Sequence, residues 1–195
     1  SRDDRTMNKT ALLLAALALT VPASAMAKPG DIQRHQVNAG TLDADGFTLV
    51  RTVTGRMFVE MPCKFNELSF ADAPNTDGNS PYEKSATIVL CVEPEKLPDW
   101  AMVLRGSYDT GAAGADHFFE QQFADDAKAG KAERLDYNGD KAFISLISQE
   151  GRCKWKLAVR HGADLVTINY FATATDCKTT KARAERIMNS LDILE

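Results

Sequence analysis

Short runs in which hydrophobic and polar residues alternate predict β-strands in the middle of the chain. Residues 47–53 and 56–61 alternate in this way on either side of Thr54-Gly55, a dipeptide typical of a hairpin turn. Two further runs, residues 86–92 and 100–108, are rich in β-branched and aromatic residues. We therefore expect a sheet that begins near the first of these runs.

The second half of the chain predicts a three-stranded antiparallel meander, because Glu150-Gly151 and residues 161–164 are turns that set the register. The first turn places Leu146 opposite Trp155, Ile144 opposite Leu157 and Ala142 opposite Val159. The second places Trp155 opposite Tyr170, Leu157 opposite Ile168 and Val159 opposite Val166. Both turns put the same residues on one face, which we interpret as the core face. Cys153 belongs to this face, opposite Ala172.

The other face of the same three strands carries basic and aromatic side chains. Lys154, Lys156 and Arg160 share the middle strand, with Phe143 on one neighbouring strand and Phe171 on the other. Such a face on an acidic protein is a possible docking surface for an anionic or apolar partner. The alternative is a solvated face, or one that a helix partly covers.

Apolar residues recur at three- and four-residue spacing in two other segments, which predicts amphipathic helices. The first spans about residues 114–129, with Phe118, Phe119 and Phe123 as its core anchors. The second spans about residues 179–191 and is expected to pack its apolar stripe on the sheet.

The beginning of the chain has the pattern of a secretory signal peptide. Met7 and Lys9 precede an apolar run over residues 11–21, and small residues at Ala25 and Ala27 suit a signal peptidase. The run is about half as long as the roughly 20 residues that cross a bilayer. We expect cleavage after Ala27, with cleavage after Ala25 as the alternative.

This pattern divides the chain into four parts. Residues 1–6 are interpreted as a tag remnant or a misplaced start, and residues 7–27 as the signal peptide. Residues 28–45 hold Gly, Pro, Asp and Asn with few large apolar groups, which predicts a flexible N-terminal arm. Residues 46–195 are expected to form a single α+β domain.

Composition and charge exclude several classes of partner. The chain has 195 residues, of which 44% are hydrophobic and 26% charged, and its formal net charge is -4. These values are typical of a soluble globular protein and provide no general basic excess for nucleic acid. We expect no binding to nucleic acid and no membrane anchor after signal cleavage.

All four cysteines follow the predicted signal peptide: Cys63, Cys91, Cys153 and Cys177. An even number in an exported chain predicts two disulfides. Three pairings are possible, and we prefer Cys63 with Cys91 and Cys153 with Cys177, because each would join strands expected to be neighbours. A zinc site is the alternative, but the chain has no Cys-x-x-Cys pair and its three histidines are scattered.

Three segments resemble the Mog/PsbP-like superfamily: Phe58–Pro62, Leu135–Ala142 and Arg186–Leu191. The second contains a Gly-x-x-Ala pattern and the third an Ile-x-x-Ser-Leu pattern, and the resemblance spans roughly residues 46–193. It implies an antiparallel β-sheet flanked by helices, an α/β/α sandwich of the α+β class. The resemblance implies no specific activity, because proteins with related folds have different roles: a photosystem subunit, a partner of a small GTPase and exported bacterial proteins.

The sequence contains no set of residues that predicts catalysis or a cofactor. Its serines lie outside any Gly-x-Ser-x-Gly context, and His117 and His161 are expected on the surface. Asp43-x-Asp45-Gly46 lacks the bidentate Glu of a calcium loop. We therefore expect no cofactor and no resident metal.

Turn-forming and polar residues fill the segment 71–84, which predicts a long surface loop. One alternative function is a small periplasmic enzyme whose site is built in this loop from Asp72, Asp77 and Tyr82. Another is an accessory subunit of an envelope complex.

The favoured hypothesis is a periplasmic or secreted, non-enzymatic binding module. Its partner would be a protein or a small anionic ligand. An enzyme should instead show a deep pocket in which several titratable side chains converge.

Overall fold

The computed structural model describes residues 43–52, 56–64, 67–74 and 85–194. Its strands are β1 (Thr48–Thr52), β2 (Met57–Met61), β3 (Leu68–Pro74), β4 (Ser85–Cys91), β5 (Asp99–Ser107), β6 (Lys131–Tyr137), β7 (Asp140–Gln149), β8 (Arg152–His161), β9 (Asp164–Thr173) and β10 (Asp192–Ile193). Its helical elements are η2 (Pro94–Lys96), α1 (Ala112–Ala129), η3 (Cys177–Thr180) and α2 (Lys181–Asn189).

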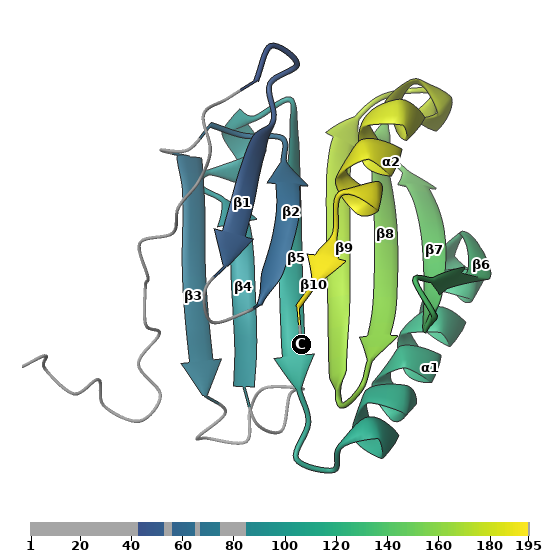
Figure 1. Cartoon of the computed structure of the whole chain (residues 1–195). Coiled ribbons are helices and arrows are strands. Elements are labelled where there is room, and N and C mark those ends of the chain that lie inside the picture. Colours follow the sequence, from purple (N-terminus) through teal and green to yellow (C-terminus); the bar gives the residue numbers. More distant parts are fainter. Residues whose placement is uncertain (1–42, 53–55, 65–66, 75–84, 195) are drawn as a thin grey trace, which may run out of the picture.

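The strands form two antiparallel sheets. The larger has seven strands in the order β3-β4-β5-β9-β8-β7-β6, and the smaller has the order β1-β2-β10. Figure 1 shows the small sheet and α2 together in front of the large sheet, with α1 at its lower right. Helix α1 packs with β7, β8 and β9 around a separate apolar cluster, so it covers the opposite face. The predicted α+β fold, an antiparallel sheet flanked by helices, is confirmed.

The register of the meander is confirmed at every pair that the two turns predict. Leu146 pairs with Trp155 across β7 and β8, and Trp155 pairs with Tyr170 across β8 and β9. Cys153 lies opposite Ala172 as expected. These side chains belong to the main core, where Val50 and Val59 of the small sheet and Ile187 of α2 pack against the large sheet.

Strand β3 corrects part of the predicted surface loop. Residues 71–74 continue β3 and pair with β4, whereas residues 75–84 lie outside the described residues. Strand β3 is the edge of the large sheet, and an edge strand tolerates proline and polar residues that a central strand would exclude. Its composition therefore resembles that of a loop.

Strand β6 forms the other edge of the large sheet and was not predicted as a strand. Most of its side chains are exposed, so its sequence carries no apolar alternation. The short strand β10 likewise has too few residues to produce a pattern.

Two disulfides join the layers, and both follow the preferred pairing. Cys63, just after β2, is bonded to Cys91 at the end of β4. Cys153 of β8 is bonded to Cys177 of η3, immediately before α2. Disulfides of this kind persist in oxidising compartments, which is consistent with export.

Candidate functional site

Helix α1 covers most of the basic and aromatic face that the sequence suggested for docking. The Phe143 ring is fully buried against Phe119 and Phe123 of α1, with ring centroids 5.3 and 5.5 Å apart. Arg160 approaches Asp116 of α1, with Nε to Oδ1 at 3.1 Å. Phe143 therefore packs inside the molecule, whereas Arg160 stays partly exposed at the edge of α1.

Lys156 is also taken into the interior, where it forms a buried polar group with α1. Its Nζ lies 3.1 Å from Oδ2 of Asp126, and the Ser145 hydroxyl donates a hydrogen bond of 2.6 Å to the same oxygen. Lys156 is 7% exposed and Asp126 is 6% exposed. Since both charges are buried and paired, this group holds α1 to the sheet rather than presenting charge to a partner.

The rest of the predicted face, Lys154 and Phe171, lies beyond α1 and is half-buried. The pairing of β5 with β9 places Trp100 beside Phe171. Their rings are stacked, with centroids 4.0 Å apart and planes inclined by 17°. The Lys154 ammonium stands 5.8 Å from the Phe171 centroid, a cation-π arrangement.

These rings form one wall of a groove of about 190 Å³, and we call it the aromatic groove. Its other wall is the η2 turn, which connects β4 to β5. The lining residues are Pro94, Glu95, Leu97, Pro98, Trp100, Arg152, Phe171, Ala172 and Thr173. A concave site with apolar walls and a few charged groups is the usual form of a small-ligand site.

Among the described residues, Arg152 is the one cation that lines this groove, and Lys154 lies next to the groove, by the ring of its lining residue Phe171. Arg152 and Lys154 are two residues apart on β8, so they share the face that carries Phe171. Within the described part of the chain, neither forms an ion pair with a carboxylate. Burial lowers the pKa of the Lys154 ammonium, the charge of Lys156 lowers this pKa further, and Asp126 opposes the shift. An anion bound near Lys154 would therefore favour the charged form of the ammonium and raise its pKa again.

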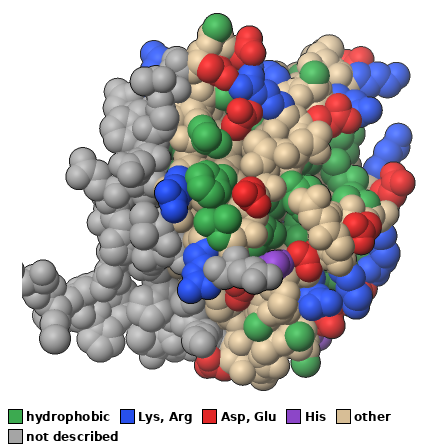
Figure 2. Space-filling view, in the orientation of Figure 1, with side chains coloured by type: hydrophobic (Ala, Val, Ile, Leu, Met, Phe, Trp, Pro, Cys, Tyr) green, Lys and Arg blue, Asp and Glu red, His purple; other side chains and the backbone are tan. Residues whose placement is uncertain are grey.

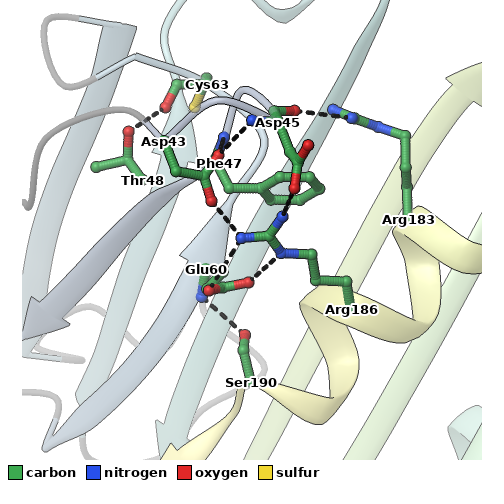
Figure 3. Close-up of polar contacts among 9 residues, drawn as sticks. All are labelled: Asp43, Asp45, Phe47, Thr48, Glu60, Cys63, Arg183, Arg186 and Ser190. Carbon is green, nitrogen blue, oxygen red and sulfur yellow. Dashed lines mark hydrogen bonds and ion pairs between the residues drawn. The ribbon is translucent and has the colours of Figure 1, made fainter.

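A second charged cluster joins α2 to the small sheet (Figure 3). The Arg186 guanidinium binds Asp43, Asp45 and Glu60, with 3.0 Å to Asp45 and 2.6 Å to Glu60, and lies 4.1 Å from the centroid of Phe47. Three carboxylates saturate this cation, so the cluster stabilises the fold and leaves no guanidinium free to bind an anionic ligand. It also holds residues 43–45, the end of the predicted arm, whose residues 28–42 are outside the described range.

Acidic and basic side chains are interspersed over the face that carries α2 and the small sheet (Figure 2). Where this face consists of described residues, it therefore presents no extended field of one sign. The cations of the aromatic groove lie on the opposite face of the large sheet, with α1.

The described residues contain no group of three or more His, Cys, Asp or Glu side chains placed to hold a metal ion. Nor does any helix among them have the length and apolarity to cross a membrane. His161 Nδ1 lies 2.7 Å from Asp140, at the β8–β9 turn. Of the loop proposed for an enzymatic site, the Asp72 side chain and residues 75–84, with Asp77 and Tyr82, lie outside the described part of the chain.

Sequence reasoning found Lys154 and Phe171 but missed Trp100, Arg152 and the η2 wall. Trp100 and Phe171 are far apart in the chain and meet only because β9 crosses back to pair with β5. The available signal was weak: Trp100 and Met102 share the face of β5 that points away from the core, and they alternate with the buried Ala101 and Val103.

No protein-family model matches the chain, and no curated protein is similar to it. Among solved structures, the chain is similar to the solution structure of cyanobacterial PsbP (CyanoP) from Synechocystis sp. PCC 6803. The TM-score is 0.45 and the sequence identity 12%, and the match covers 80% of this chain and 96% of that chain.

Proposed function

We propose that this protein is an exported binding module whose aromatic groove takes a ligand with an anionic group and an apolar body. The observation that carries the proposal is the stacked Trp100–Phe171 pair beside Arg152. The rings and Leu97 supply an apolar wall, and Arg152 supplies a bidentate donor for a carboxylate or a phosphate. Lys154 adds a second cation whose charge is poorly solvated.

Titration with 3-phenylpropionate, which carries one ring and one carboxylate, tests the groove. Amide shifts in NMR spectra should localise to η2, Trp100 and Phe171. Arg152→Gln should weaken binding about tenfold or more, because a hydrogen bond to a charged group contributes roughly 1.5–3 kcal/mol. Lys128→Gln is the matched control: this exposed α1 lysine lies away from the groove lining and should leave the affinity unchanged. An unchanged affinity of Arg152→Gln would refute the site.

Export is the second part of the proposal. The signal pattern of residues 7–27 and the two interlayer disulfides support it. Protein recovered from the native host should begin at Lys28 or, if the alternative site is used, at Met26. Intact-mass measurement checks this, and a mature protein that retains residues 7–27 would contradict cleavage.

A further inference from the structure

The aromatic groove carries charges of both signs. Arg152 contributes a guanidinium from β8, and Glu95 contributes a carboxylate from η2. The two residues do not form a salt bridge with each other, and no ion-pair partner of Glu95 is found within the described residues. Both charged groups are therefore available to a ligand.

These two charges restrict the ligands that suit the groove. A ligand with a carboxylate alone gains from Arg152 but is repelled by Glu95, whereas an amine alone gains from Glu95 but is repelled by Arg152 and Lys154. A ligand with both groups close together is attracted by each side of the groove. Specificity of this kind rests on repulsion as much as on attraction.

The size of the groove sets a second restriction. Its volume of about 190 Å³ is smaller than the roughly 300–1,000 Å³ of sites for drug-sized ligands. Pro94, Leu97 and Trp100 provide apolar surface for a group of about one ring or one branched chain. A free amino acid fits this description, because its carboxylate and ammonium share one carbon and its side chain projects from the same atom.

We propose that the ligand of the aromatic groove is a free α-amino acid with an apolar or aromatic side chain. Arg152 binds its carboxylate, Glu95 binds its ammonium, and the Trp100–Phe171 wall receives its side chain. This inference rests on the proposed function and narrows it from anionic ligands in general to zwitterions.

Three probes that share a phenyl ring test the proposal: L-phenylalanine, 3-phenylpropionate and 2-phenylethylamine. Each is titrated into the full mature protein with calorimetry and with NMR detection of the Trp100 indole N–H. Phenylalanine should bind at least tenfold more tightly than either singly charged probe. A shared site is established by shifts at the same groove residues for every probe that binds.

Two charge-removing variants separate the roles of the ligand groups. Glu95→Gln should weaken phenylalanine about tenfold and strengthen 3-phenylpropionate, because a repulsion is removed. Arg152→Gln should weaken phenylalanine and strengthen 2-phenylethylamine. Glu133→Gln is the acidic control, since this exposed residue of β6 is outside the groove lining. Circular dichroism melts confirm that each variant is folded.

The two levels of proposal fail in different ways. If 3-phenylpropionate binds as tightly as phenylalanine and Glu95→Gln changes neither affinity, the zwitterion inference is overturned while anion binding stands. If none of the three probes shifts the groove resonances, the proposed groove function fails as well, and the inference fails with it.

Discussion

Asp126 shows how one side chain can determine the role of a neighbouring surface. It lies on the buried face of α1, seven residues after Phe119, where it accepts the Ser145 hydrogen bond and pairs with the Lys156 ammonium. Its adjacent neighbour on the helix, Asp125, is exposed. Successive helical residues point about 100° apart, so only one of the two carboxylates can reach the sheet.

Asp126→Asn should therefore destabilise the protein by about 3–5 kcal/mol, because it leaves the buried Lys156 ammonium without a counter-charge. Urea unfolding followed by circular dichroism measures the loss. Asp125→Asn is the matched control and should change the free energy of unfolding by no more than about 0.5 kcal/mol. Equal effects of the two substitutions would contradict the buried ion pair.

At the scale of elements, two different kinds of polar contact hold the C-terminal part of α2. Arg186 binds carboxylates before β1 and on β2, and the Tyr137 hydroxyl bonds to the carbonyl oxygens of Met188 and Leu191, each at 2.8 Å. Burial raises the pKa of Tyr137 to about 12, so this hydroxyl stays protonated at neutral pH. The small sheet and α2 thus form one layer through polar contacts as well as through the core.

The Arg186 cluster should weaken in acid. The hydrogen bond from the Phe47 amide and the Arg186 guanidinium lower the pKa of Asp43 below its ordinary value of 3.8, against the opposing effect of desolvation. Because the pKa of Asp43 is lower in the folded protein than in the unfolded chain, its ionised form stabilises the fold at any pH above the unfolded-state pKa. This stabilisation is lost as the pH falls through the folded-state pKa of Asp43.

An NMR pH titration tests this behaviour. The Phe47 amide should shift together with the Asp43 carboxylate at a pH below the ordinary carboxyl pKa of 3.8. Asp43→Asn should remove this shift and loosen residues 43–45 at neutral pH. Asp109→Asn, at an exposed carboxylate before α1, should do neither. A Phe47 titration that persists in Asp43→Asn would show that another group controls the cluster.

At the scale of the molecule, the two disulfides join the front layer to the large sheet at different places. Cys63–Cys91 closes a segment with a sequence separation of 28, and Cys153–Cys177 closes one of 24. All four cysteines are buried and bonded, so reagents for free thiols should not react with the folded protein.

Each disulfide should contribute about 3–4 kcal/mol by restricting the unfolded chain over loops of this length. Replacing either pair by alanine should lower the melting temperature, and replacing both should lower it further. Differential scanning calorimetry of the mature protein measures the three variants beside the oxidised protein. A double replacement that melts at the original temperature would contradict this account.

Local patterns in the sequence were sufficient for the meander and the two helices, whereas the disulfides, although paired as preferred, join different layers rather than neighbouring strands. Turns such as Glu150-Gly151 lie between strands that are adjacent in the chain, and a two-residue period then sets which side chains face the core. Helix α1 was predicted for the same reason, since its three- and four-residue apolar spacing is contained in the helix itself. Strands β3 and β6 escaped because edge positions need no apolar alternation.

Only the tertiary structure decided which parts of the basic face remain available. The position of α1 buries Lys156 and Phe143, while the pairing of β5 with β9 brings Trp100 against Phe171 and creates the aromatic groove. The two-residue period of a strand predicts which residues share a face. It does not predict which helix covers that face, or which strand from a distant part of the sequence pairs with the strand in question. Those choices depend on contacts between segments far apart in the chain, where the total burial of apolar surface decides the arrangement.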